Sequence, residues 1–133
     1  MTSYRTDISR ARGLGSARHG AGHWLAERIT SVALVPLGLW SVYSVLNLSR
    51  LDYDGAVEWL RSSAVNPVLL VLTLAISFLH MHNGMRVIVE DYIEHKPSRL
   101  FWILLSAGAS LLAASLSIFA VLKVALGAPL GAG

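Results

Sequence analysis

Three long apolar runs separated by charged segments dominate the pattern along this chain. They extend over Ile29–Leu48, Asn66–Met85 and Leu100–Leu122, and none contains Asp, Glu, Lys or Arg. Runs of about 20 apolar residues match the length that a helix needs to cross roughly 30 Å of hydrocarbon. Because lipid offers no hydrogen-bond partner to a backbone group, each run is predicted to be a helix, and the chain an all-α membrane protein. The three predicted transmembrane helices lie at about residues 29–48, 66–89 and 100–122.

The polar segments outside these runs divide the chain into a tail and a membrane unit. Residues 1–21 are rich in Gly, Ser and Arg and carry four arginines against one acid, Asp7. We interpret them as a basic cytoplasmic N-terminal tail, either solvated or docked as an arm on a partner. Residues 22–133 form the predicted three-helix membrane anchor. The first run begins far from the N-terminus and lacks a small-residue cleavage pattern, so it is expected to stay in the mature protein.

The distribution of basic residues predicts how the helices are oriented. Five arginines lie before or at the start of the first run, and Lys96 and Arg99 follow the second run. The segment between these runs has only Arg50 and Arg61 as basic residues. Because basic residues are retained on the cytoplasmic side, the N-terminus and the second loop are predicted to be cytoplasmic and the C-terminus periplasmic. Residues 50–65 then form an outer loop that could carry a short surface helix.

The overall composition agrees with a membrane protein and excludes several other classes. Of 133 residues, 54% are hydrophobic and 14% charged, and the mean hydropathy is +0.56, too apolar for an ordinary soluble domain. The chain has no cysteine, so it cannot itself ligate an iron–sulfur cluster or supply a thiolate. The formal charge of +3 and the pI of 9.7 arise mainly from the tail, so we expect membrane lipid and no nucleic acid as its partner.

The helix predicted from the second run ends in the segment HMHNGMRVIVEDY, His80 to Tyr92, which carries the candidate chemistry. His80 lies thirteen residues beyond Pro67, well inside the predicted span, where an ionisable side chain is costly without a partner. At about 100° per residue, His80 and Asp91 share one helix face, roughly 16 Å apart. Gly84 lies one turn beyond His80 and has no side chain to block a flat ligand. This layout favours a cofactor site with His80 as an iron ligand over a hydrogen-bonded packing histidine.

A second histidine and two arginines are candidates for supporting roles. His82 is rotated by about 200° from His80, so the two cannot bind the same iron. Neither the first nor the third run contains a histidine, so a six-coordinate b-type haem on His80 would take its other ligand from another chain. His82 and Arg86, one turn apart, could hold haem propionates or line a subunit interface. Arg28, at the membrane edge, is either a snorkelling anchor or a partner for a buried anion such as a propionate.

The dipeptide Asp91-Tyr92 falls at the predicted cytoplasmic edge of the membrane, where a quinone head group could lie with its tail in lipid. A tyrosine hydroxyl can hydrogen-bond a quinone carbonyl, and a nearby carboxyl can relay protons from water. An interfacial tyrosine beside a solvated acid is the alternative interpretation. The histidine in the same helix favours the quinone site.

These residues also carry a family resemblance. The pattern His80-x-x-x-Gly84-x-x-x-x-x-x-Asp91-Tyr92, in the second of three spans, resembles the small cytochrome b556 membrane-anchor subunit of succinate dehydrogenase, complex II. The stretch GHWLAERITSVALVPLGLW, Gly22 to Trp40, is similar to the start of the first helix in bacterial members of that family. Together with the three-helix layout, the resemblance covers nearly the whole chain.

The resemblance implies specific roles for four residues. His80 matches the axial ligand of haem b, which also makes it the residue that binds the haem iron. Tyr92 matches the tyrosine that contacts ubiquinone, with Asp91 beside it on the proton path. Arg28 matches an arginine near the haem and the quinone.

The resemblance also implies partners and a place in metabolism. Members work with a flavoprotein subunit that carries FAD, an iron–sulfur subunit, and a second cytochrome b anchor that supplies the other haem histidine. The expected function is that of a membrane-anchor subunit of succinate:ubiquinone oxidoreductase, in the tricarboxylic acid cycle and in aerobic respiratory electron transport. Such a chain is not an enzyme alone, and its expected location is the bacterial inner membrane.

Other interpretations stay open. The spacing His80-x-x-Asn83-Gly84-x-Arg86 also resembles the sister anchor of the same complex, although Asp91-Tyr92 favours the small anchor. A self-contained b-type cytochrome or a small helical transporter would place His80 opposite its own copy in a homodimer. A purely structural helical scaffold would bind no haem. Some family members carry a histidine at the start of the first helix, and His23 falls one place from it, so its role is not assigned.

Overall fold

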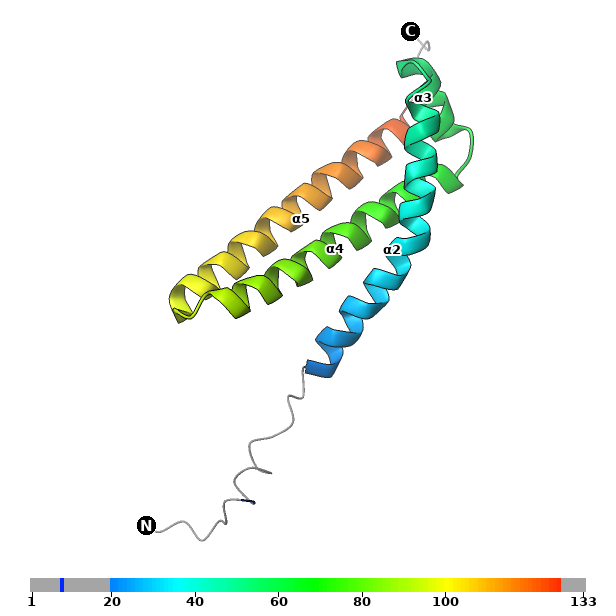
Figure 1. Ribbon diagram of the computed structural model, residues 1–133. Helices are drawn as coiled ribbons and strands as arrows, with labels where there is room; N and C mark the ends of the chain where they lie inside the picture. The colour runs from blue at the N-terminus through cyan, green and yellow to red at the C-terminus, as the bar shows by residue number, and fades with distance from the viewer. Residues whose placement is uncertain (1–7, 9–19, 128–133) are drawn as a thin grey trace.

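The computed structural model describes Ile8 and residues 20–127, and this part of the chain is helical, with no strand (Figure 1). Its helices are α2 (Gly20–Leu48), α3 (Tyr53–Arg61), α4 (Val65–Tyr92) and α5 (Lys96–Leu126). Three of them are long and apolar enough to cross a membrane, at Trp24–Leu48, Val65–Tyr92 and Lys96–Leu126. The predicted all-α membrane fold with three spanning helices is confirmed. Apart from Ile8 and the first residues of α2, the predicted tail at residues 1–21 lies outside the described residues.

The helices are longer than the apolar runs that predicted them. Helix α2 begins at Gly20 instead of near residue 29, and α4 continues to Tyr92. Charged residues are tolerated where a helix leaves the hydrocarbon, so a run without charges marks the membrane core and not the helix ends. Helix α5 begins at Lys96 because Pro97 is compatible with a first helical turn.

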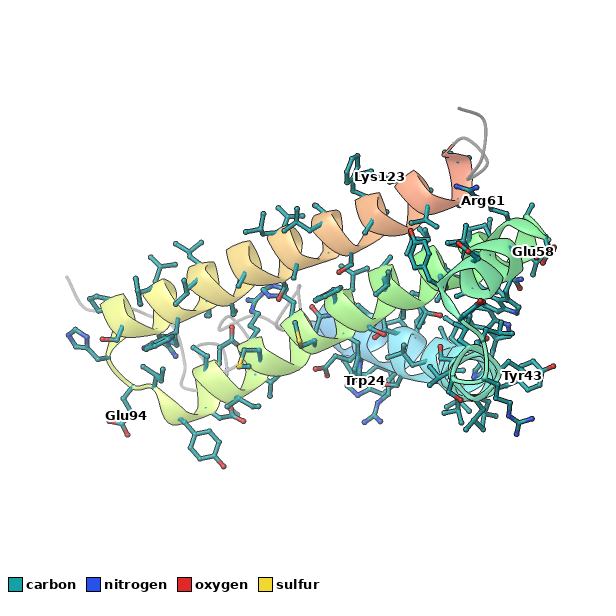
Figure 2. All side chains as sticks on the ribbon, turned by 90° about the horizontal axis from the view of Figure 1, so that it is seen from above. Trp24, Tyr43, Glu58, Arg61, Glu94 and Lys123 are labelled. Carbon is teal, nitrogen blue, oxygen red and sulfur yellow. The ribbon has the colours of Figure 1, made fainter. Side chains whose placement is uncertain are left out.

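Helix α4 lies at the centre of the arrangement. It packs against α5, to which it runs antiparallel, and against α2, whereas α2 and α5 make no extensive contact with each other (Figure 1). The short connection between Tyr92 and Lys96 joins α4 to α5, and Glu94 marks this end of the molecule in Figure 2. Because α4 has a neighbour on each side, residues on its different faces meet different helices.

Helix α3 lies at the other end of the bundle, within the segment predicted to be an outer loop. Asp52 caps it by accepting a hydrogen bond from the backbone N–H of Gly55 at 2.9 Å, and its Val57 and Leu60 are buried. A side-chain cap of this kind satisfies a donor that the first turn leaves unpaired. The sequence Asp-Tyr-Asp-Gly, followed by an apolar face, therefore forms a short amphipathic helix rather than an irregular loop.

Most of the apolar surface is not covered by the chain itself. Val32, Leu39 and Leu111 are 71%, 70% and 70% exposed, although all three lie within spanning helices. Among the described residues, six side chains are buried: Leu37, Ser44, Val57, Leu60, Val89 and Ser110. Large uncovered apolar faces on a helical protein are compatible with lipid or with neighbouring membrane subunits. The three helices thus position residues on α4 without enclosing them.

Candidate functional site

The candidate site is centred on His80, which α4 places against α2. The imidazole is half-buried, and its Nδ1 lies 3.1 Å from the hydroxyl oxygen of Thr30. The same hydroxyl is 2.9 Å from the carbonyl oxygen of Ala26 and 3.0 Å from that of Glu27, one turn earlier in α2. Within the described residues, Nε2 of His80 has no hydrogen-bond partner. One ring nitrogen is therefore held by the neighbouring helix, and the other makes no hydrogen bond within the described chain.

Gly84 lies one turn beyond His80 on α4, as the sequence predicted. Outside the nearby backbone of α4, a Cβ atom built on Gly84 would meet no atom of the described residues within 4 Å, so packing within this part of the chain does not require glycine here. The same is true of Gly108 on α5, so open space alone does not define a site. What distinguishes Gly84 is its position one turn from the His80 ring, where a side chain would project beside any ligand of Nε2.

His82 faces a different neighbour, as its rotation from His80 predicted. It lines a groove of about 410 Å³ between α4 and α5, together with Phe78, Ala107 and Ser110. Its Nδ1 is buried and has no hydrogen-bond partner among the described residues. The two histidines therefore lie on different faces of α4: His80 faces α2 and His82 faces α5.

The two arginines proposed to reach an anion are both engaged with side chains one turn away. The Nε of Arg86 donates to Oε1 of Glu90 at 2.7 Å, and the two side chains are 47% and 39% exposed. Arg28 is exposed, and its guanidinium carbon lies 5.5 Å from the centroid of the Trp24 ring. A guanidinium over an indole is a cation–π contact, which suits an anchor at the membrane interface. A propionate contact by Arg28, His82 or Arg86 stays a prediction.

Asp91 and Tyr92 end α4, at the end of the bundle away from α3. Tyr92 is 82% exposed and Asp91 is also exposed. The helix is continuous from His80 to Tyr92, so the eleven-residue spacing that places His80 and Asp91 on one face holds in the structure. No hydrogen bond within the described residues ties either side chain to the rest of the chain. Both are thus free to meet a group that approaches this end.

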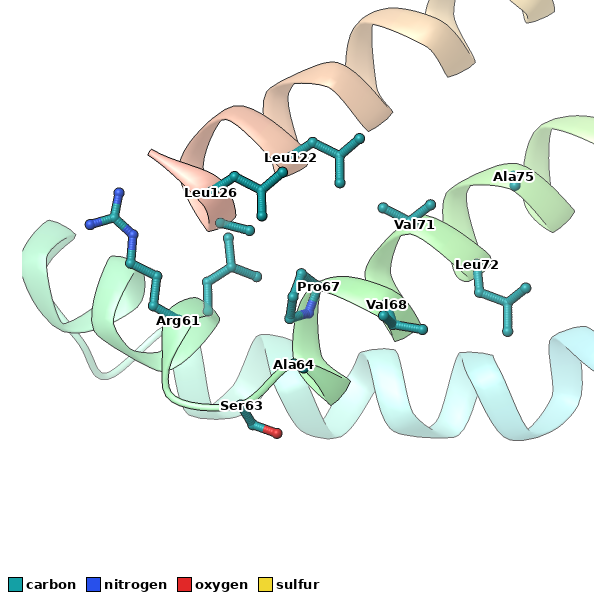
Figure 3. Close-up of a pocket in the computed structure, with 12 residues that line it drawn as sticks. Arg61, Ser63, Ala64, Pro67, Val68, Val71, Leu72, Ala75, Leu122 and Leu126 are labelled. Atoms are coloured by element: carbon teal, nitrogen blue, oxygen red, sulfur yellow. The ribbon is translucent and has the colours of Figure 1, made fainter. Parts of the chain in front are cut away.

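A further groove of the described chain lies at the opposite end from Asp91 and Tyr92. It has a volume of about 610 Å³ between α3 and the facing ends of α4 and α5 (Figure 3). Arg61 and Ser63 are its polar members, and its walls are apolar side chains that include Pro67, Leu122 and Leu126. It contains none of the residues that the sequence singled out. We therefore do not assign the candidate chemistry to this groove.

Thr30 is the residue that sequence reasoning missed. It is a small polar residue two positions after Arg28 in an apolar run, and residues of this kind in spanning helices more often serve packing. The signal that it has a partner lies in the packing of α2 on α4, which the sequence pattern does not specify. Among the described residues, no three His, Cys, Asp or Glu side chains cluster as they would to hold a metal ion directly.

Comparisons with known proteins place these observations in a family. A family model described as "Succinate dehydrogenase/Fumarate reductase transmembrane subunit" matches residues 2–125. The "Succinate dehydrogenase hydrophobic membrane anchor subunit" of Rickettsia conorii is 34% identical over 96 residues, which are 72% of this chain and 76% of the relative. The protein of the same name from Rickettsia bellii is 35% identical over 68% of this chain and 72% of its own length.

A more distant relative extends the match beyond that genus. The "Succinate dehydrogenase membrane anchor subunit" of Reclinomonas americana is 27% identical over 90 residues, which are 66% of this chain and 75% of the relative. No solved structure gives a significant match. The names of these relatives agree on one role, that of a membrane anchor.

Proposed function

Because this chain belongs to the succinate dehydrogenase/fumarate reductase transmembrane subunit family, we propose that it binds haem b together with a second anchor subunit and helps to form a ubiquinone reduction site. The family resemblance found in the sequence is confirmed at the level of a succinate dehydrogenase membrane anchor. Such a chain is a non-catalytic, multi-pass membrane subunit that works in a complex with other subunits. Of the two anchors in such a complex, we favour the small one because Asp91-Tyr92 follows the His80 motif.

The environment of His80 carries the haem part of this proposal. Its Nδ1 is occupied by Thr30 of α2, its Nε2 has no partner in the described chain, and Gly84 leaves space one turn away. These features fit a neutral imidazole that offers one lone pair to an iron beside an uncrowded helix face. Haem b, when bound, supplies a centre that accepts and releases one electron. The role of this chain is then to hold one axial position from inside the membrane.

The second axial ligand is proposed to come from the other anchor subunit. His82 lies against α5 and cannot reach an iron on the His80 face. A second chain packed on the uncovered apolar faces of the helices would supply the missing histidine and would also bury part of that surface. The proposed complex further contains a flavoprotein with FAD and an iron–sulfur subunit, and it takes part in the tricarboxylic acid cycle and aerobic respiration.

The quinone part of the proposal rests on Tyr92 and Asp91. The Tyr92 phenol is exposed at the end of a spanning helix, so it can donate a hydrogen bond to a quinone carbonyl whose isoprenoid tail stays in lipid. The exposed Asp91 carboxylate beside it can pass a proton from water toward the reduced carbonyl. Reduction of a quinone to a quinol takes two electrons and two protons, so a proton path at this end is a requirement of the chemistry.

The direction of the chain in the membrane is proposed from its charges. Arg86, Lys96 and Arg99 lie near the end that carries Tyr92, and Arg28, near the start of α2, lies on the same side of the first span. Basic residues near span ends are retained in the cytoplasm, so this end is proposed to be cytoplasmic, with the C-terminus in the periplasm. The membrane is then the bacterial inner membrane.

The test is a reduced-minus-oxidised visible spectrum of the complex purified through a tag on the full chain. We expect His80→Ala to lose the low-spin b-type signal, because nothing else on that face can replace the imidazole. The matched control is His82→Ala, which changes a histidine two positions away on the opposite contact of the same helix and should retain the signal. A full haem signal in assembled His80→Ala complex would overturn the axial assignment. A complex without haem in the unmodified protein would overturn the haem proposal as a whole.

A further inference from the structure

The contact between Thr30 and His80 joins two helices through one polar pair in an apolar environment. We propose that Thr30 is a positioning residue for the haem ligand: its hydroxyl accepts a hydrogen bond from Nδ1–H of His80 and so directs the lone pair of Nε2 toward the iron. This inference rests on the proposed role of His80. It concerns a residue on a different helix, which no motif of the second span includes.

The hydroxyl of Thr30 can donate its hydrogen to acceptors other than His80. Carbonyl oxygens of Ala26 and Glu27 lie 2.9 and 3.0 Å from the hydroxyl oxygen, at the positions where helical threonines donate back to the preceding turn. Other hydroxyls in the spanning helices do the same at 2.7–2.8 Å: Ser31, Ser41, Thr73 and Ser115. A hydroxyl has one hydrogen and two lone pairs, so after this bond Thr30 can only accept.

The position of the Thr30 hydrogen then determines which nitrogen of the His80 imidazole carries a hydrogen. If Thr30 accepts at 3.1 Å, Nδ1 of His80 must carry the hydrogen, and in the neutral ring Nε2 must carry the lone pair. The opposite tautomer would place an N–H at Nε2, where the described chain offers no acceptor, and an unpaired donor in an apolar medium is costly. Only the first tautomer leaves every donor of the pair satisfied and an imidazole able to ligate a metal.

The same hydrogen bond would change the reduction potential of the haem iron as well as orient the imidazole ring. A hydrogen bond donated by the imidazole nitrogen that does not bind the metal raises the basicity of the ligating nitrogen and fixes the rotation of the ring. Loss of such a partner typically weakens metal retention by about 10- to 100-fold. A more basic ligand stabilises the ferric form more than the ferrous form. Removal of the Thr30 hydroxyl is therefore expected to raise the reduction potential of the haem.

The decisive variant is Thr30→Val in the intact complex, because valine keeps the β-branched shape and removes the acceptor. We expect a higher haem midpoint potential, an altered low-spin ferric electron paramagnetic resonance signal, and about 10-fold weaker haem retention. Thr30→Ser keeps the hydroxyl and should restore the unmodified potential and signal. Thr73→Val is the matched control: its hydroxyl donates only to the carbonyl of Leu69 at 2.7 Å, so its loss should leave the haem unchanged.

The outcomes separate this inference from the function on which it rests. If His80→Ala abolishes the haem signal but Thr30→Val leaves the potential and resonance signal unchanged, the positioning role is wrong and the axial ligand stands. If Thr73→Val shifts the potential as much as Thr30→Val, the effect is a general response of the bundle and the inference is also wrong. Should Thr30→Val fail to assemble, Thr30→Cys retains the volume with a weaker acceptor and must give a potential shifted in the same direction.

Discussion

The two ends of this bundle are built in opposite ways. At the α3 end, Trp59 stacks on Trp40 of α2 with ring centroids 6.3 Å apart, and Nε of Arg61 donates to the carbonyl of Val124 in α5 at 2.8 Å. The amide of Asn66 at the start of α4 donates to the carbonyl of Trp59 at 2.7 Å. Through these contacts α3 connects all three spanning helices, and Figure 2 shows Arg61 near Lys123 at this end. At this end the chain joins its spanning helices through its own side chains.

The opposite end is left open. Its single side-chain contact between spanning helices among the described hydrogen bonds is that of Thr30 with His80, and beyond it Tyr92 is 82% exposed. Every residue with candidate chemistry lies in this half of the bundle. The difference agrees with the proposal that the α3 end stabilises the anchor, whereas groups from outside the chain complete the other end. Substitutions at the two ends should therefore affect different measurements.

The largest effect should come from filling the open space beside His80. Outside the nearby backbone of α4, a Cβ atom on Gly84 meets no described atom within 4 Å, so Gly84→Leu should leave the fold intact while colliding with a haem on Nε2. We expect loss of most of the b-type absorbance in the purified complex. Gly108→Leu is the control, since it introduces the same side chain at an equally open glycine on α5. Normal absorbance in Gly84→Leu would mean that no flat ligand occupies this face.

The next effect should appear in quinone reduction. Tyr92→Phe removes a hydroxyl from a side chain that is 82% exposed, so it should not change stability, but it should lower succinate-dependent ubiquinone reduction by about 100-fold. Electron transfer from succinate to a soluble dye that bypasses the anchor should be unaffected.

The control for Tyr92 lies at the other end of the molecule. Tyr53, the first residue of α3, is 69% exposed, so Tyr53→Phe makes the same chemical change at a similarly exposed site. It should leave ubiquinone reduction unchanged. Equal losses in the two variants would contradict the assignment of quinone chemistry to one end.

The fold and the geometry within α4 could be predicted from the sequence because they depend on local periodicity. Runs without charges give the spans, and the helical period alone separates His80 from His82. The contact of Arg28 with Trp24 follows the same rule, since residues four apart lie together on a helix, and the sequence could have revealed it. Helix α3 was less visible because its apolar face is short.

The contacts between helices could not be predicted in this way. That Thr30 meets His80 depends on how far α2 is shifted along α4 and how it is rotated, and fifty residues separate the two in sequence. Many alignments of apolar helices bury similar surface, so hydrophobicity does not select one. The sequence thus identified the helix that carries the candidate ligand but not the hydroxyl that holds it.

The smallest effect, and the one confined to the α3 end, should follow from loss of the tryptophan stack. Trp59→Ala removes the partner of Trp40 and should lower stability by about 2 kcal/mol, of which roughly 1 kcal/mol is the aromatic pair itself. The expected result is a lower thermal unfolding midpoint of the purified complex with an unchanged haem spectrum and unchanged ubiquinone reduction. Trp59→Phe, which retains an aromatic ring against Trp40, should recover most of the stability. A change in the haem spectrum of Trp59→Ala at a temperature where the complex remains assembled would show that the two ends are coupled, and the division between a stabilising end and a reactive end would then be wrong.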